Sequence, residues 1–316
     1  MTVNNTSMNA GLNSSPSLRA INERVIIVEV LIAVFLYTDT LLIFTFFQKD
    51  YFRTNTRYIF FVHTLLCDWL FLFVTNILLL LSYFVLPMPA WICVIICVLM
   101  GVLTFATPLT LTAMCLERYV AICMPLRHAD IYTIRRSFHC LLVVHSLSCI
   151  QSIVIISIFF ASVSLSFYTQ NKICQVEMLI VHKWQSLLRS VISQLYFLIM
   201  SCTILFTYVK IMAAAKEASS DKKSTSKGRK TVILHAAQLL LCLIQLWCPF
   251  IEGTVMDIDF RMFIDLRYFD YIVFILAPRC LCPLVYGLRD DKFYMALKYH
   301  ALCGLNKKIS PKFVDI

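Results

Sequence analysis

The stretch Leu111-Thr-Ala-Met-Cys-Leu-Glu-Arg-Tyr-Val-Ala-Ile-Cys-Met-Pro-Leu126 closes a long apolar segment that begins near Trp91. It carries an acid, a base and an aromatic residue in succession, Glu117, Arg118 and Tyr119. Charged side chains are costly deep inside a membrane, so a charged pair at the end of an apolar segment indicates the cytoplasmic mouth of a spanning helix. The alternative is an ordinary surface ion pair on a helix end.

The composition of the whole chain supports a membrane protein. Of the 316 residues, 60% are hydrophobic and 15% are charged, and the mean hydropathy is +0.79. A soluble domain of this size could not bury so much apolar surface. Most of the 14 cysteines lie inside apolar segments, where we expect them to act as small hydrophobic residues. No Cys and His residues have zinc-finger spacing and no nucleophile–base set appears, so we expect no metal, no cofactor and no enzymatic activity.

Seven apolar segments are each long enough for the roughly 20 residues that a spanning helix needs. They lie near Val25–Gln48, Tyr58–Tyr83, Trp91–Cys123, Phe138–Ser162, Leu187–Met212, Thr231–Ile251 and Phe263–Gly287. The expected fold class is therefore all-α, a seven-transmembrane helix bundle over residues 25–288. Residues 289–316 are expected to form a short amphipathic helix and a cytoplasmic tail, because Phe293 and Leu297 fall on one face of a charged segment.

The distribution of Lys and Arg predicts the orientation of the chain. The net charge is +10, and most of the basic residues fall on the cytoplasmic side if residues 1–24 form an extracellular tail. The basic loops then face anionic membrane lipid and a cytosolic partner, not nucleic acid. We therefore expect a multi-pass plasma-membrane protein with its N-terminus outside. Asn4, Asn5 and Asn13 each begin an N-x-Ser/Thr sequon, which fits a glycosylated outer tail.

The run Met114-Cys-Leu-Glu-Arg-Tyr-Val-Ala-Ile-Cys-Met-Pro-Leu126 resembles the end of the third helix of rhodopsin-like G-protein-coupled receptors. In this longer form it resembles odorant receptors, and the Cys-Leu-Glu version resembles those of fish. The segment Gly287-Leu-Arg-Asp290 adds to the odorant-receptor likeness. The resemblance implies a receptor that binds a small-molecule odorant within the helix bundle and activates a heterotrimeric G protein.

The resemblance also implies a switch at the inner ends of the helices. Its expected members are Glu117, Arg118, Tyr119, Tyr208, His235, Pro283 and Tyr286. In the family the acid holds the arginine at rest, and the arginine meets the G protein in the active state. Tyr208 matches the tyrosine that packs near this arginine on activation. In the seventh-helix motif Cys282-Pro-Leu-Val-Tyr286, Cys282 replaces the usual asparagine.

A disulfide is implied at the outer side. Cys93 lies at the outer start of the third helix, and Cys174 lies in the long loop between the fourth and fifth. Both positions face an oxidising compartment, where a disulfide persists. Rhodopsin-like receptors join this loop to the third helix at the matching positions, so we expect a Cys93–Cys174 bridge. The alternative is two free thiols.

Three charged residues lie inside the apolar segments, at Asp39, Asp68 and Arg279. An intramembrane carboxylate is a functional candidate by default. The family has an aspartate at the position of Asp68, in a buried site for an ion and water. An arginine cannot lose its proton there, so we predict that Arg279 pairs with Asp68, or bridges Asp68 and Asp39, in place of a sodium ion. The alternative is that Arg279 points alone into a watery cavity.

The ligand pocket is expected in the outer half of the bundle, between the third, fifth, sixth and seventh helices. The candidate lining residues are Met100, Thr104, Phe105, Ser193, Tyr196, Gln245 and Ile272. Met100 stands where amine receptors of the family have an aspartate, which argues against an amine ligand. An aromatic pocket with few hydroxyls suits small apolar or weakly polar ligands. The alternative is that these are ordinary helix-packing residues.

Two other functions compete with the odorant receptor. One is a non-olfactory rhodopsin-like receptor for a small ligand. The other is a transporter, a class that tends to show internal repeats and broken helices. No such repeat is visible in the sequence.

Overall fold

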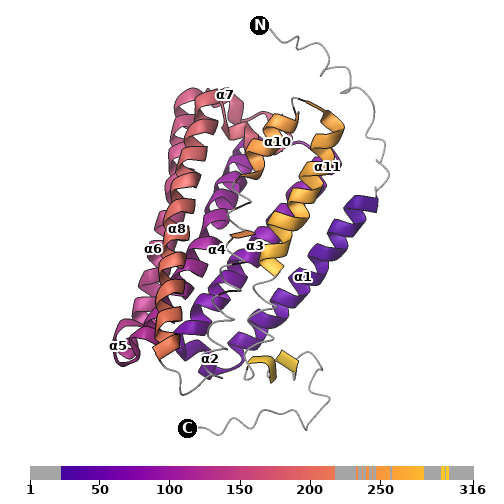
Figure 1. Ribbon diagram of the computed structural model, residues 1–316. Helices are drawn as coiled ribbons and strands as arrows, with labels where there is room; N and C mark the ends of the chain where they lie inside the picture. Colours follow the sequence, from indigo (N-terminus) through magenta and orange to yellow (C-terminus); the bar gives the residue numbers. More distant parts are fainter. Residues whose placement is uncertain are drawn as a thin grey trace.

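Long α-helices form the frame of the protein in the computed structural model (Figure 1). The structure describes residues 23–217, 233, 237, 240, 241, 244, 247–256, 258–280, 293–295, 297 and 298. Five helices in this part of the chain are long and apolar enough to cross a membrane. They are α1 (Glu23–Phe47), α3 (Thr56–Tyr83), α4 (Ala90–Cys123), α6 (Ile134–Ser162) and α8 (Lys183–Glu217). They correspond to the first five predicted spans and differ from them by a few residues at their ends.

The outer surfaces of these helices are apolar, which explains why they form as spanning helices. Large side chains such as Phe138, Leu142 and Ile199 are exposed on α6 and α8. In a lipid environment every backbone polar group needs an internal partner, and an α-helix supplies one within a single segment. The hydroxyls on these helices follow the same rule. Thr38, for example, donates to the carbonyl of Val34 one turn earlier, at 2.8 Å.

Helix α4 is the centre of the bundle and packs against α3, α6 and α8 (Figure 1). Leu111 and Met114 of α4 are fully buried in the main hydrophobic cluster, where Phe60 of α3 lies. Gly101 allows α6 to approach, because a Cβ atom at this position would lie 2.6 Å from Ser152 Oγ. Small residues at helix contacts are the usual way to bring membrane helices close together.

Short elements lie at the two ends of the bundle (Figure 1). At one end are α2 (Asp50–Thr54) and α5 (Pro125–Ile131). At the other end are α7 (Leu165–Tyr168), the 3₁₀-helix η2 (Val176–Leu179) and a two-stranded antiparallel sheet of β1 (Met88–Pro89) and β2 (Asn171–Lys172). Met88 pairs with Lys172, so the loop between α6 and α8 is tied to the start of α4.

The last described helices carry parts of the predicted sixth and seventh spans. They are α10 (Cys248–Met256), α11 (Phe260–Asp270) and the π-helix η3 (Tyr271–Leu276), after which the chain continues as a helix to residue 280. Helix α10 runs five residues past the predicted end at Ile251, and α11 begins before the predicted start at Phe263. The Asp259 side chain caps α11 by accepting from the backbone N–H of Arg261 at 2.8 Å. This cap explains the earlier start.

A few residues after the seventh span are described as well. Residues 293–295, 297 and 298 are helical. Phe293 is fully buried, and its ring centroid lies 5.1 Å from that of Phe52 in α2 and 6.1 Å from that of Tyr58 in α3. The other residues of the predicted amphipathic helix lie outside the described part of the chain.

Candidate functional site

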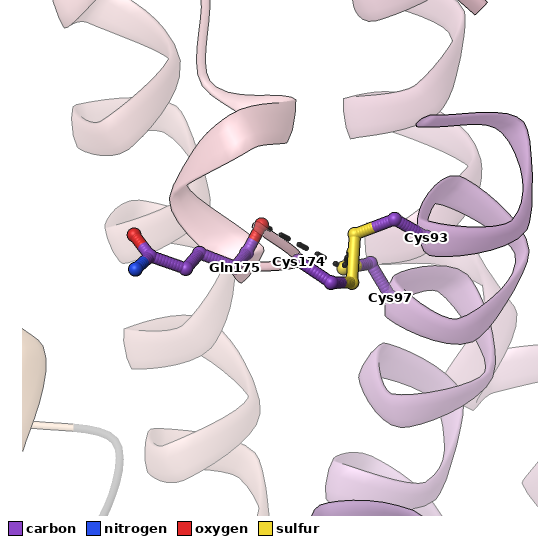
Figure 2. Close-up of a disulfide and its surroundings, with 4 residues drawn as sticks. All are labelled: Cys93, Cys97, Cys174 and Gln175. Carbon is purple, nitrogen blue, oxygen red and sulfur yellow. Dashed lines mark hydrogen bonds between the residues drawn. A yellow bond between two sulfur atoms is a disulfide. The ribbon is translucent and has the colours of Figure 1, made fainter. Parts of the chain in front are cut away.

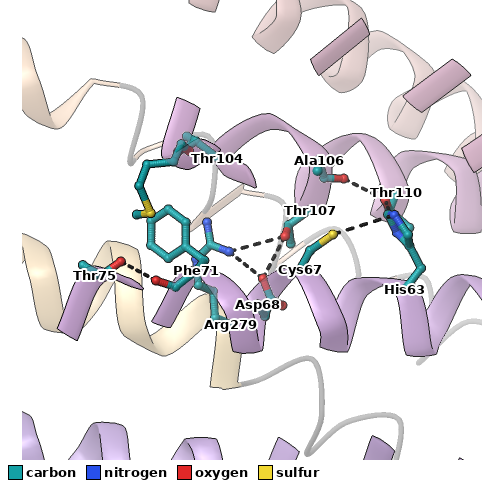
Figure 3. A network of polar contacts seen from close by, with 11 residues as sticks. His63, Cys67, Asp68, Phe71, Thr75, Thr104, Ala106, Thr107, Thr110 and Arg279 are labelled. Atoms are coloured by element: carbon teal, nitrogen blue, oxygen red, sulfur yellow. Dashed lines mark hydrogen bonds and ion pairs between the residues drawn. The ribbon is translucent and has the colours of Figure 1, made fainter. Parts of the chain in front are cut away.

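A buried ion pair joins the helical segment that ends at residue 280 to α3. The Arg279 guanidinium Nη1 lies 2.6 Å from Asp68 Oδ1, and the two side chains are 3% and 0% exposed. Thr107 of α4 donates to the same carboxylate oxygen at 2.7 Å and accepts from Arg279 at 3.4 Å. The guanidinium carbon lies 3.5 Å from the centroid of the Phe71 ring. Figure 3 shows these four side chains converging from three segments of the chain.

The arrangement gives each charge a partner in a place where water is scarce. Removing one partner from a buried ion pair costs about 3–5 kcal/mol, because the other charge is left uncompensated. The aromatic face beneath Arg279 adds a cation–π contact, which is stronger when the cation is desolvated. Asp68 and Arg279 therefore hold the α3 segment and the seventh-helix segment together.

Of the two predicted arrangements, the Arg279–Asp68 pair is formed and the bridge to Asp39 is not. Asp39 is buried on α1, but among the described residues the ion pair of Arg279 is with Asp68 alone. Asp39 Oδ2 and Arg279 Nε have no hydrogen-bond partner within the described residues.

An apolar cluster connects the ion pair with the candidate ligand pocket. Phe71, which lies under Arg279, packs with Met100 and Leu103 of α4. Ile275 of the π-helix η3 packs against the same cluster. A change at Met100 therefore acts on the surroundings of Arg279 through direct packing.

A second acid–arginine pair lies near the C-terminal end of α4. Arg118 Nε lies 3.0 Å from Glu117 Oε2, and the two side chains are 18% and 5% exposed. His128 of α5 reaches the second carboxylate oxygen, with its Nε2 atom 3.1 Å from Glu117 Oε1. The His128 ring stacks on Tyr132. Burial raises the pKa of Tyr132, and the nearby Glu117 carboxylate raises it further.

Two tyrosines were predicted to belong to the same switch. Tyr119 follows Arg118 directly in α4, and Tyr208 lies on α8. The Tyr119 ring makes an edge contact with Phe206 of α8, at a centroid distance of 5.6 Å. Tyr208 is half-buried on α8. Helix α8 therefore packs against the Glu-Arg-Tyr end of α4.

Sequence reasoning missed His128 and Thr107. His128 follows Pro125, which stands at the first position of α5 and lets the chain turn back beneath α4. Thr107 is one of several threonines on α4, and nothing in the spacing distinguishes it from Thr104, whose hydroxyl donates to the Met100 carbonyl at 2.8 Å. The Met-Pro-Leu-Arg-His order after the Glu-Arg-Tyr run is the one signal that could have indicated His128.

The predicted disulfide at the outer end is confirmed. Cys93 of α4 and Cys174 are bonded, with a Cα–Cα distance of 5.4 Å (Figure 2). Cys97 lies one turn further along α4, with its sulfur 3.8 Å from the carbonyl oxygen of Gln175. Phe159 of α6 is fully buried in the same cluster as the disulfide. The bridge therefore fixes the loop before α8 on top of the α4–α6 contact.

The candidate pocket residues form two groups. Phe105 and Tyr196 are in ring contact at a centroid distance of 5.0 Å, and Tyr196 donates to the Leu147 carbonyl of α6 at 2.6 Å. Ser193, one turn earlier on α8, has two acceptors for its one hydroxyl hydrogen, the Arg189 carbonyl at 2.9 Å and Gln151 Oε1 of α6 at 3.2 Å. These residues lie where α4, α6 and α8 meet.

The second group lies on the side of α1 and α3. Met100 packs with Phe71, as described above, and Thr104 donates to its own helix. Ile272 of η3 packs against a cluster formed by Val28 and other residues of α1 and α3. The hydroxyls of Thr104, Ser193 and Tyr196 all have protein partners, so the described lining presents mainly apolar surface.

The remaining predicted residues lie outside the described part of the chain. They are Asn4, Asn5, Asn13, His235, Gln245, Pro283 and Tyr286.

Comparison with known proteins gives two kinds of match. A family model of the seven-transmembrane receptors of the rhodopsin family matches residues 38–286. The chain is 40% identical over 302 residues to Odorant receptor 131-2 of Danio rerio, a match that covers 95% of this chain and 93% of that protein. It is 25% identical over 238 residues to Galanin receptor 2a of Danio rerio, covering 70% of this chain and 61% of that receptor.

Proposed function

The chain belongs to the rhodopsin family of seven-transmembrane receptors and to its odorant receptors, and from this premise we propose that it binds a small odorant within the helix bundle and activates a heterotrimeric G protein. It is a multi-pass membrane receptor and not an enzyme. The observation that carries the proposal is the course of α4, which runs from the disulfide at Cys93, past Met100 and Phe105, to the Glu117–Arg118 pair. One helix thus contacts the candidate pocket and the candidate coupling surface.

The proposed ligand is apolar or weakly polar. The hydroxyls of Ser193 and Tyr196 already have acceptors within the protein, so they offer little hydrogen bonding to a ligand. Met100, Phe105 and Tyr196 supply polarisable and aromatic surface, which is the usual lining of a small-molecule site. Gln245 and Ile272 complete the proposed lining.

The Asp68–Arg279 pair is proposed as a fixed substitute for a bound cation in the middle of the bundle. Its guanidinium supplies a permanent positive charge beside Asp68. We expect sodium to have no effect on ligand affinity, because the Arg279 guanidinium already balances the charge of the Asp68 carboxylate.

The Glu117–Arg118 pair is proposed as the switch that meets the G protein. Glu117 contacts both Arg118 and His128, and we assign this arrangement to the resting receptor. Activation would release Arg118 toward the G protein, exchanging one charge-assisted contact for another. Tyr119, Tyr208, His235, Pro283 and Tyr286 are the further residues assigned to this switch.

The proposed topology places residues 1–24 outside the cell, residues 25–288 in the membrane and residues 289–316 in the cytosol. The positive charge of the cytosolic loops supports it. In this topology Asn4, Asn5 and Asn13 are accessible for glycosylation. The basic loops face anionic lipid and the G protein, and no nucleic-acid partner is proposed.

A ligand screen in cells that report cyclic AMP tests the proposal. Nucleotide exchange on a purified G protein is the second readout, because it does not depend on a particular downstream enzyme. We expect responses to small volatile or weakly polar compounds. Phe105→Leu should shift the concentration dependence, whereas Phe138→Leu, on the exposed face of α6, should not. A response only to peptides, in both assays, would contradict the odorant assignment.

A further inference from the structure

A cluster of nitrogen and sulfur ligands lies on α3 and α6, beside the apolar cluster that contains Met100. His63 and Cys67 are one turn apart on α3, and His145 lies opposite them on α6. The two Nε2 atoms are 2.8 Å apart, and Cys67 Sγ is 3.7 Å from His63 Nε2. All three potential ligand atoms lie within 4.8 Å of one another. The imidazoles are half-buried and the thiol is buried.

The hydrogen-bond partners of His63 determine which of its nitrogens has a free lone pair. Thr110 has one hydroxyl hydrogen, which it donates to the Ala106 carbonyl at 2.7 Å. Its oxygen, 3.2 Å from His63 Nδ1, therefore accepts from that nitrogen. A neutral imidazole has one N–H, so His63 Nε2 carries a lone pair directed at Cys67 and His145. Figure 3 shows the chain of contacts from Ala106 through Thr110 to His63 and Cys67.

This is the arrangement that proteins use for metal-binding histidines. A ligating imidazole normally donates its second N–H to a neighbouring group, which fixes the tautomer and the ring orientation. Metal–nitrogen bonds of about 2.0–2.1 Å and metal–sulfur bonds of about 2.3 Å place neighbouring ligand atoms roughly 3.3–3.7 Å apart in a tetrahedral or trigonal site. The sulfur–nitrogen distance already fits, and the two imidazoles need to separate by only about 0.5 Å.

We propose that His63 Nε2, His145 Nε2 and Cys67 Sγ bind a soft monovalent transition-metal ion, Cu⁺, that clamps α3 to α6. Thiolate and imidazole ligands favour copper and zinc among the common metals. The site lies in the apolar part of the bundle, where net charge is costly. Cu⁺ with one thiolate and two neutral imidazoles is uncharged, whereas Zn²⁺ would leave a positive charge. Binding forms a copper–sulfur bond and releases the Cys67 thiol proton to water, without oxidation or reduction.

The competing interpretation is a hydrogen bond in which His145 Nε2–H donates to His63. A His145→Gln variant separates the two, because the glutamine amide can donate a hydrogen bond but is a poor copper ligand. The purified full chain in nanodiscs is titrated with Cu⁺, kept reduced by ascorbate, against a chromogenic Cu⁺ chelator. We expect the wild-type chain to hold one Cu⁺. In His145→Gln and in Cys67→Ser we expect the affinity for Cu⁺ to fall at least about 100-fold.

Two matched controls and one spectroscopic measurement complete the test. His139→Gln, on the exposed face of α6, and Cys202→Ser, exposed on α8, should leave the affinity unchanged. Thr110→Val should weaken binding by about 10–100-fold, because it removes only the acceptor that orients His63. X-ray absorption should show one sulfur and two nitrogen ligands, and the apo variants should melt at the wild-type Tm. Equal copper binding in wild type and His145→Gln, or tighter binding of Zn²⁺ than of Cu⁺, would overturn the proposal.

Discussion

The two acid–arginine pairs of this receptor use the same chemistry in opposite settings. Asp68 and Arg279 are 211 residues apart in sequence, almost completely buried, and come from different helices. Glu117 and Arg118 are neighbours in sequence, lie at the end of one helix, and leave the arginine 18% exposed. The first pair joins two parts of the bundle. The second pair links two adjacent residues of one helix, so it adds no connection between helices.

The difference indicates which pair can change its partner. A buried arginine that loses its carboxylate is left without water to replace it, so the Asp68–Arg279 contact is expected to persist throughout the activity cycle. An arginine at a helix end can exchange its neighbour for solvent or for a protein partner at low cost. The same two residue types therefore serve as a structural link in one place and as a switch in the other.

The largest expected effect comes from Arg279→Met, which removes the buried cation and keeps an apolar stem against Phe71. Asp68 would be left charged and unpaired, and we expect a loss of about 3–5 kcal/mol in the free energy of unfolding. The measurement is the Tm of the purified receptor together with its level at the cell surface.

The double variant Arg279→Met with Asp68→Asn is the control for this prediction. Removing both charges should restore much of the stability, because no unpaired ion remains. Asp39→Asn should rescue Arg279→Met less than Asp68→Asn does, since Asp39 forms no ion pair with the arginine. If Asp39→Asn rescues as well as Asp68→Asn, the assignment of the partner is wrong.

The disulfide provides a covalent link for comparison with the buried ion pair. Cys93→Ser should cost about 2–5 kcal/mol and reduce surface expression. The Cys93→Ser/Cys174→Ser double variant should be no worse than either single variant, because one bond is lost in all three. Additive losses of surface expression would show that the two cysteines contribute separately.

A smaller effect on stability is expected from a change at Thr107. It tests how much the buried Asp68–Arg279 pair depends on the Thr107 hydroxyl. Thr107→Val removes the hydroxyl that donates to Asp68, and we expect a loss of about 1–3 kcal/mol, because the carboxylate loses a buried partner. Thr104→Val is the matched control, since that hydroxyl bonds only to its own helix and should matter less. Equal Tm values for the two variants would contradict a special role for Thr107.

The smallest effect on stability, with the largest effect on signalling, is expected for Arg118→Ala. Glu117 keeps its contact with His128 when Arg118 is removed, so the receptor should fold and reach the surface. Cyclic AMP responses to any identified agonist should be lost, because the proposed contact with the G protein is absent. A well-expressed Arg118→Ala receptor that signals normally would remove this pair from the switch.

The pairing of charged residues inside the apolar segments could be predicted from the sequence. Arg279 and Asp68 stand out because ionised groups are rare in the spans, and each needs compensation. The Asp68 pair was predicted, and the sequence left open only whether Arg279 also bridges to Asp39, because it does not contain the distances between helices. The five described spans were predictable from apolar length alone. In the predicted seventh span, the Asp259 cap moved the start of α11 by a few residues.

Contacts between helices made by ordinary residues could not be predicted. His63, Cys67 and His145 show no metal-binding spacing, because His145 is supplied by another helix. His128 reaches Glu117 only because α5 turns back beneath the end of α4. The local sequence contains the turn at Pro125, but it contains no information on which side chain the turn brings to the carboxylate.

The π-helix η3 determines which way Arg279 points. A π turn holds one residue more than the α turn it replaces. Each residue of a regular α-helix advances the chain by about 100°, so the extra residue held at Tyr271–Leu276 shifts the phase of every residue after it. The same sequence wound as an uninterrupted α-helix would point Arg279 about 100° away from the face that meets Asp68. The ion pair therefore depends on helical phase as much as on charge.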